Sequence, residues 1–191
     1  MAYSDGPGSL YYAGQILADA QFRALMRKVE VLERDRIYCR HGIAHALDVC
    51  RIAWIRFCER NAGHLEAAQL PGYKDRIYCI GLLHDTGRCA QYETGENHAP
   101  AGARIAEEIL SRIGYPADMT AEAVRIIGTH RGRLKTAELF DMAADAAPLL
   151  LSDEVELCIR HADQLARNCM LCPASDTCKW AADEKNDAIR A

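Results

Sequence analysis

The sequence predicts an all-α domain. Apolar residues recur at the three- and four-residue spacing of amphipathic helices through most of the 191 residues. No part of the chain shows a series of alternating polar and apolar runs, the pattern typical of strands. Aromatic residues make up only 7% of the chain and alanine is abundant, which favours helix. We therefore expect one helical domain over residues 13–168, with a loose tail at 1–12 and a cysteine-bearing segment at 169–191 packed on the same domain.

The individual helices follow from the apolar spacing and from residues that start or stop a helix. Gly63, Pro71 and Gly72 mark a loop over residues 61–72. Thr120 and Ser152 are predicted to be the N-caps of the helices that follow them. A further loop is expected at 92–97. The predicted helices cover residues 15–36, 43–58, 74–86, 98–112, 120–130, 135–146 and 153–169.

The central motif of the chain is the stretch Ile80-Gly-Leu-Leu-His84-Asp85-Thr-Gly87-Arg88. An apolar run leads directly into an imidazole and a carboxylate. Burial of such a pair costs several kcal/mol unless a partner compensates it, and a metal ion is a common partner. A His-Asp dipeptide also occurs by chance, so the prediction depends on further ligands elsewhere in the chain.

Further candidate ligands lie next to the apolar stripes of other predicted helices. Each of these histidines alone would be interpreted as a packing residue, and Asp163 alone as a surface carboxylate. Imidazoles and carboxylates that project from several helices of a bundle are, however, how metal sites in bundle cores are built. Such a set suits iron, manganese or zinc, and the absence of cysteine from it argues against a structural zinc site. The six candidates are His45, His84, Asp85, His98, His130 and Asp163.

One ligand position has a competitor. His41 and His45 are four residues apart and share a helix face, so either imidazole could be the first ligand. His41 would otherwise lie behind the ligands, face the substrate or lie on the surface.

Three segments of the chain resemble the HD superfamily of metal-dependent phosphohydrolases. They are His45-x-x-x-Val49, Leu83-His84-Asp85-Thr-Gly87-Arg88 and Ala162-Asp163, and the resemblance spans residues 37–167. It implies a helical fold in which His45, His84, Asp85 and Asp163 hold a first metal ion. The valine four residues after His45 favours that histidine over His41 as the ligand.

Two further segments resemble the branch of the superfamily that binds two metal ions. They are His98-Ala-Pro-x-Gly102-Ala and Thr129-His130-Arg131. This branch includes bacterial enzymes that split diadenosine tetraphosphate symmetrically. The resemblance implies that Asp85 bridges to a second ion held by His98 and His130.

The implied activity is hydrolysis of a phosphoester or phosphoanhydride in a nucleotide or dinucleoside polyphosphate. A metal-bridged hydroxide would attack phosphorus, and Asp85 would hold both ions. Arg88 and Arg131 would bind the remaining phosphates, because a guanidinium matches phosphate geometry. Both arginines could instead be exposed residues at helix ends.

Two other functions remain open. One is a dinuclear-iron oxygenase of the same fold, and the other is a non-catalytic HD module that binds a ligand. The non-catalytic alternative is disfavoured because all six ligand positions are filled.

A second concentration of possible ligands lies near the C-terminus, in Cys169-Met-Leu-Cys172-x5-Cys178. Three thiols within ten residues could hold zinc or an iron–sulfur centre, with a fourth ligand from Cys158 or Cys39. The alternative is that these thiols are free. Four other cysteines lie in apolar helical surroundings and are predicted to be small core residues: Cys50, Cys58, Cys79 and Cys158.

Composition limits the partners. A formal net charge of −4 and the absence of a basic cluster argue against nucleic acid, and no apolar run reaches the ~18 residues of a membrane helix. The first residues lack the pattern of a signal peptide, and nine cysteines are an odd number. We expect a cytoplasmic protein with reduced thiols and a small phosphorylated substrate. Tyr11 and Tyr12 leave a homo-oligomer possible.

Overall fold

The computed structural model describes residues 10–130 and 151–186. The expected all-α class is confirmed, since these residues form α-helices and short 3-10 turns and contain no strand. The helix predicted over 135–146 and the candidate Arg131 lie outside the described residues. No helix in the described ranges combines the length and apolarity needed to cross a membrane. The α-helices are α1 (Tyr11–Ala18), α2 (Ala20–Leu32), α3 (Ile43–Arg60), α4 (Leu70–Leu83), α5 (Arg88–Thr94), α6 (His98–Arg112), α7 (Ala117–Thr129) and α9 (Leu151–Leu165).

The N-terminal helix predicted over 15–36 is two helices. The break falls at Asp19, whose backbone is extended and whose carboxylate accepts a hydrogen bond from the Phe22 amide at 3.0 Å. Asp19 therefore caps α2, and an N-cap residue cannot at the same time continue a preceding helix. α1 begins at Tyr11, inside the stretch expected to be a tail.

Other boundaries also differ from the prediction. α4 begins at Leu70 because Pro71 is accommodated in the first turn, where its missing amide costs no hydrogen bond. α5 was not predicted. Thr120 is not an N-cap: Pro116 holds that position, and the Thr120 hydroxyl donates to the Pro116 carbonyl from within α7. Ser152 likewise lies inside α9, which already includes Leu151.

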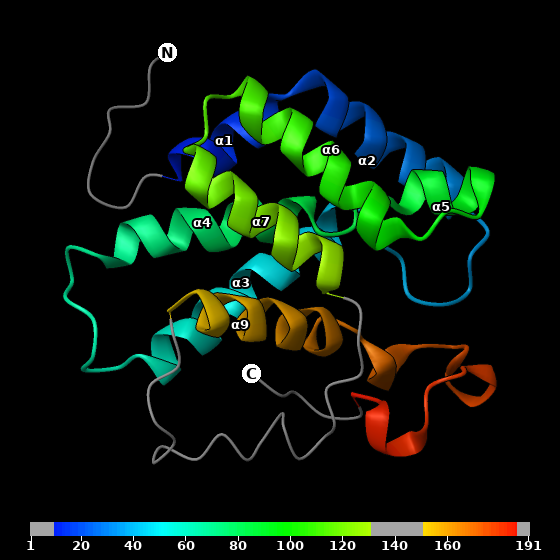
Figure 1. Ribbon diagram of the computed structural model, residues 1–191. Helices are drawn as coiled ribbons and strands as arrows, with labels where there is room; N and C mark the ends of the chain where they lie inside the picture. Colours follow the sequence, from blue (N-terminus) through cyan, green and yellow to red (C-terminus); the bar gives the residue numbers. More distant parts are fainter. Residues whose placement is uncertain (1–9, 131–150, 187–191) are drawn as a thin grey trace.

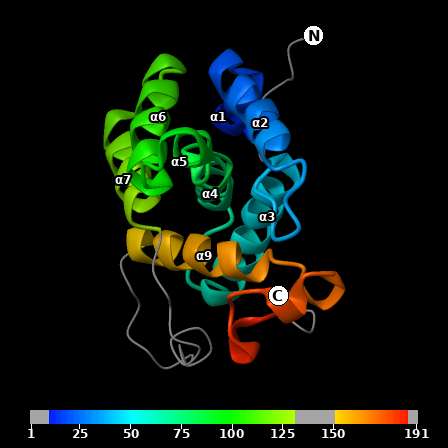
Figure 2. The same cartoon turned by 90° about the vertical axis from the view of Figure 1, so that its right-hand side faces the viewer.

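Helix α4 lies at the centre of the domain. It packs against α3, α1, α7 and α9, and five consecutive residues from Cys79 to Leu83 are buried. α3 comes so close that a Cβ atom on Gly81 would lie 2.7 Å from the Cys50 sulfur. Figure 2 shows α6 and α7 on one side of α4 and α1, α2 and α3 on the other, and Figure 1 shows α9 below α4. The chain leaves this enclosed helix at His84, so the His-Asp pair begins inside the core.

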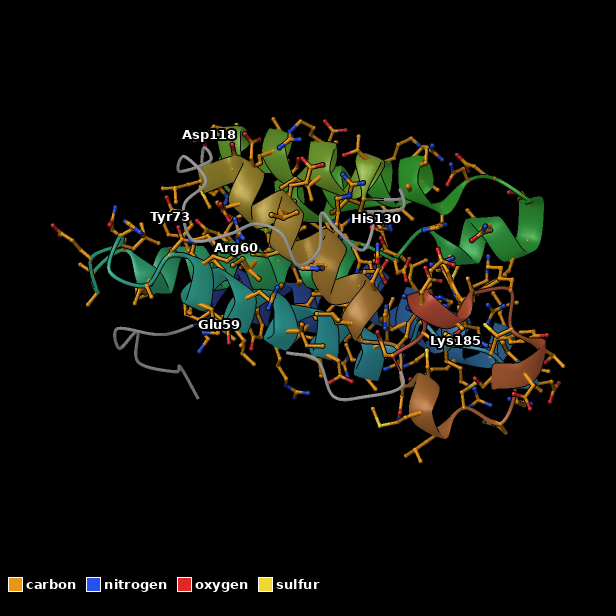
Figure 3. All side chains as sticks on the ribbon, turned by 90° about the horizontal axis from the view of Figure 1, so that it is seen from below. Glu59, Arg60, Tyr73, Asp118, His130 and Lys185 are labelled. Carbon is orange, nitrogen blue, oxygen red and sulfur yellow. The ribbon has the colours of Figure 1, made fainter. Side chains whose placement is uncertain are left out.

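Helix α9 is fixed to α3 by a partly buried ion pair. Arg60, at the end of α3, donates to both carboxylate oxygens of Glu154 at 2.6 and 2.8 Å. Figure 3 shows Arg60 where α3 passes α9. At the other end of α9, the buried Asn186 amide donates to the carbonyls of Gln164, Leu165 and Arg167 and so satisfies the end of the helix. The C-terminal segment is thereby held against α9.

Burial of His161 in α9 predicts a loss of stability in mild acid. Burial, together with the nearby Arg56 and Arg60, lowers the pKa of His161 to about 4. Between this value and the unfolded pKa of ~6.5, only the unfolded chain binds the proton, so stability is full above pH 6.5 and falls as the pH is lowered through this range. The loss should reach up to about 3 kcal/mol.

The measurement is urea unfolding at several pH values from 7 down to 5 for the wild type and His161→Gln. His64→Gln, in an exposed loop, is the matched control. The dependence of the unfolding free energy on pH should become weaker in His161→Gln and should stay unchanged in His64→Gln. An unchanged slope in that variant would contradict the assignment.

Candidate metal centre

Five helices bring the six predicted ligands together. His84 and Asp85 lie in the turn that directly follows α4, His45 lies in α3 and Asp163 lies in α9. His98 is the first residue of α6, and His130 directly follows α7. Figure 3 shows His130 at the point where α7 ends. The ligand atoms form two groups, each with all its atoms within 4.8 Å of one another: His45, His84, Asp85 and Asp163, and Asp85, His98 and His130.

The two groups share Asp85, and they use different oxygens of it. Asp85 Oδ2 lies 3.3 Å from His84 Nε2 and 3.7 Å from His45 Nε2. Asp85 Oδ1 lies 3.4 Å from His98 Nε2 and 3.9 Å from His130 Nε2. This is the arrangement of a carboxylate that can bridge two cations, with one oxygen for each.

Backbone carbonyls fix the orientation of two of the imidazoles. A carbonyl can only accept, so His84 Nδ1 donates to Gly81 O at 2.7 Å and His130 Nδ1 donates to Ile127 O at 2.6 Å. In both rings Nε2 therefore faces the centre. Such a hydrogen bond behind the ring is the usual support of a metal-ligating histidine.

Three of the imidazole nitrogens that face the centre are buried polar atoms. The Nε2 atoms of His45, His84 and His130 are buried and make no hydrogen bond within the described residues, although carboxylate oxygens lie nearby. Buried polar atoms are rarely left in this state, and a cation between nitrogen and oxygen would satisfy all of them. The residues present therefore fit one or two metal ions.

The charges within the centre are strongly coupled. Burial alone would raise the pKa of Asp85, but His84 and Arg88 hold it well below its usual range. Burial alone would lower the pKa of His84, but Asp85 and Asp163 raise it to about 10. In the absence of a cation, the carboxylates thus retain a proton on His84. A metal ion would take over this role and release the proton.

His45 and His41 have different surroundings. His45 Nε2 lies 3.2 Å from Asp163 Oδ1, within the first ligand group. His41 is engaged by Glu33, which accepts from its backbone amide at 2.6 Å and contacts its Nδ1, while the Tyr92 hydroxyl donates to the same carboxylate. This buried network was not predicted, because Glu33 gave no sequence signal beyond an ordinary helical surface charge.

Arg88 is committed to Asp85. Its Nε donates to Oδ1 at 2.8 Å and its Nη2 to Oδ2 at 3.3 Å, and Nη1 donates to Gln91. The side chain is only 12% exposed, so Arg88 is not a residue of the exposed helix end. The guanidinium fixes the plane of the carboxylate, and hence which oxygen faces which group.

Gly87 sets the distance between the turn and α6. A Cβ atom at Gly87 would overlap the His98 carbonyl oxygen and lie 2.5 Å from the Gly102 amide nitrogen. The lack of side chains at Gly87 and Gly102 lets the two backbones touch. This contact places His98, the first residue of α6, beside Asp85.

The cysteines fall into two classes. Cys50, Cys79 and Cys158 are buried as expected, and Cys58 is half-buried. Cys169, Cys172 and Cys178 lie in the segment after α9 and join neither group of metal-ligand atoms. Cys158 lies in α9, and Cys39 lies in the connection between α2 and α3.

Comparisons with known proteins show the family of the chain. The family model for the HD domain matches residues 43–168. An uncharacterized protein of Clostridium beijerinckii is 32% identical over 176 residues, which cover 91% of this chain and 95% of the relative. No solved structure matches the chain.

The contact at Gly87 predicts that a single methyl group will damage the centre. In Gly87→Ala, α6 must move away, which should cost about 3 kcal/mol and weaken metal binding at His98. Gly72→Ala is the control, since a Cβ there meets nothing within 4 Å. Thermal unfolding and manganese titration test both variants. Equal behaviour of the two would contradict the steric argument.

The two ligand groups predict two ions with separable ligands. Mn²⁺ is the appropriate probe, because it prefers carboxylate and imidazole to thiolate and so ignores the cysteines. Wild-type protein stripped of metal should bind about two Mn²⁺ per chain, and His98→Ala or His130→Ala about one. Titration calorimetry and the electron paramagnetic resonance signal of free Mn²⁺ measure the number of ions bound per chain. His64→Ala is the control. A single ion in the wild type would rule out the dinuclear centre.

Proposed function

The chain belongs to the HD-domain family, and from this premise we propose that it is a metal-dependent phosphohydrolase with a dinuclear centre. His45, His84, Asp85 and Asp163 would hold one ion and Asp85, His98 and His130 the other. Bound divalent ions would supply a water nucleophile of lowered pKa and neutralise charge on phosphate oxygens.

The observation that carries the proposal is the orientation of Asp85. Its two oxygens face two separate sets of imidazoles, 3.3–3.7 Å and 3.4–3.9 Å away. A mononuclear site would use only one of these two sets of ligands. Both sets being complete also argues against a module that has lost catalysis.

Within this centre the protein supplies position and charge. Arg88 is a positioning residue: it holds both oxygens of Asp85, as described above, and offsets their negative charge. Asp163 is the most exposed of the six ligands, with 30% of its side chain accessible, whereas His84 and His98 are fully buried. Substrate would therefore approach from the side of Asp163.

The proposed substrate is a nucleotide or a dinucleoside polyphosphate. Support comes from the dinuclear arrangement together with the motifs His98-Ala-Pro-x-Gly102-Ala and Thr129-His130, which resemble those of symmetrical diadenosine tetraphosphatases. The negative charge of a polyphosphate chain suits two adjacent cations.

The test is hydrolysis of a panel of nucleotides and dinucleoside polyphosphates by manganese- or iron-loaded protein. Diadenosine tetraphosphate should give two molecules of ADP, and in ¹⁸O-water one of them should carry the label. Asp85→Asn should lower the rate by about 10³-fold. Arg88→Lys should lower kcat with KM changed less than about twofold, because Arg88 acts through Asp85 and not on the substrate. His64→Ala should behave as the wild type.

Two results would contradict the proposal. Absence of hydrolysis of every substrate by protein that binds two Mn²⁺ would exclude the hydrolase. Consumption of O₂ by the iron-loaded protein, coupled to substrate oxidation, would favour the oxygenase alternative instead. A rise in KM alone for Arg88→Lys would place Arg88 on the substrate.

A further inference from the structure

The segment that follows α9 is built from short turns that carry three thiols. Cys169 begins a 3-10 turn closed by a hydrogen bond from the Cys172 amide to the Cys169 carbonyl at 3.1 Å. A second turn ends at Cys178, whose amide donates to the Ser175 carbonyl at 3.2 Å. All three thiols lie beyond residue 168, where the match to the HD domain ends.

The fold adds a fourth thiol from the opposite end of the chain. Cys39 lies in the connection between α2 and α3, ahead of the HD match, and its neighbour Tyr38 donates from its hydroxyl to the Thr177 carbonyl at 3.4 Å. The pKa of Cys39 is raised by burial and then by Cys169, while Arg167 lowers it and Cys178 and Cys172 raise it further. Tyr38 and Thr177 are the sequence neighbours of Cys39 and Cys178, so the hydrogen bond between them holds the chain at Cys39 beside the segment that carries the three thiols.

We propose that Cys39, Cys169, Cys172 and Cys178 bind an iron–sulfur cluster of the [4Fe–4S] type. Four cysteine thiolates are the ligand set such a cluster requires. Each cysteine binds as thiolate, so cluster binding releases one proton per cysteine to solvent. Cys169 is buried and the other three are half-buried, which leaves the cluster largely enclosed.

The spacing of the sulfur atoms argues against a single tetrahedral zinc ion. A tetrahedral zinc ion with Zn–S bonds of ~2.3 Å brings its four sulfurs to about 3.8 Å from one another. In the described part of the chain, no three thiol sulfurs fall within 4.8 Å of one another. A [4Fe–4S] cube binds one thiolate at each of four separate iron corners and so holds them further apart.

Arg167 supplies positive charge beside these thiols. Its guanidinium stacks on Trp180 at 4.2 Å from the ring centroid, and Nη2 donates to the Glu184 carbonyl. Its Nη1 is buried and makes no hydrogen bond within the described residues. A cluster with four thiolates carries net negative charge, which a neighbouring guanidinium stabilises.

The cluster would also brace the centre described above. Cys39 lies six residues before His45, and Cys169 six residues after Asp163. The two chain segments that the cluster joins are therefore continuous with the helices that carry those two ligands. Bound at this point, the cluster fixes the ends of α3 and α9 where they meet.

The test is purification of the full chain without oxygen, or reconstitution with iron and sulfide, followed by iron and acid-labile sulfide analysis and visible absorption. About four sulfides per chain and a broad visible band are expected, with an electron paramagnetic resonance signal after reduction. Acid-labile sulfide distinguishes a cluster at the cysteines from iron bound at His84 and Asp85, which contains no sulfide. The variant His84→Ala should therefore retain the sulfide content of the wild type. Cys39→Ser and each of the other three serine variants should lose most of it.

Cys58→Ser is the matched control, because Cys58 is half-buried and lies in the last turn of α3, at the end of that helix away from Cys39, and it should retain full sulfide. Circular dichroism checks that each variant is folded. If a variant fails to fold, the sulfide content and the visible spectrum of the wild type still show whether the chain binds a cluster. Absence of sulfide after anaerobic reconstitution, tightly bound zinc in its place, or a full cluster in Cys39→Ser would overturn the proposal.

Discussion

The carboxylate of Asp85 is the constraint on which the arrangement of the centre depends. It is buried, it faces four imidazoles, and its negative charge is retained because His84 and Arg88 lower its pKa. Buried charge of this kind is tolerated only when its partners surround it with accurate geometry. The chain meets this demand in three ways: α4 ends immediately before His84, Gly87 admits the backbone of α6, and Arg88 from α5 donates to both oxygens. Several helices are thus placed by one acidic group.

Much of this centre could be predicted from the sequence, for a physical reason. Helical spacing assigns each candidate to the buried face of its own helix, so His45, His98 and Asp163 could be expected to point inward before any contact was known. The contacts that hold the ligands from behind could not be predicted in this way. Glu33 bonds His41 and Tyr92 across the fold, and Arg88 could equally have faced solvent from its position in the sequence. Such pairings depend on how helices pack, which periodicity does not encode.

The helix boundaries show the same division between local and distant causes. α6 was predicted with its exact bounds because Asn97 and the apolar repeat act locally, with the Asn97 side chain accepting from the Ala99 amide. α1 was mistaken for part of a longer helix. Its first amides, at Tyr12 and Ala13, are instead satisfied by the carboxylate of Asp75, more than sixty residues away on α4. A helix start completed by a distant side chain leaves no capping signal in its own sequence.

The two proposed metal sites follow from one feature of the topology. α3 and α9 are distant in sequence, yet they cross, and Arg60 and Glu154 join them at one end. At the other end, the pair formed by His45 and Asp163 must stay close although both side chains are partly exposed. Mutual attraction of two partly hydrated groups is weak. A cross-link between the chain immediately before α3 and the chain immediately after α9 would restrict exactly the motion that separates them, and that is where the four thiols lie.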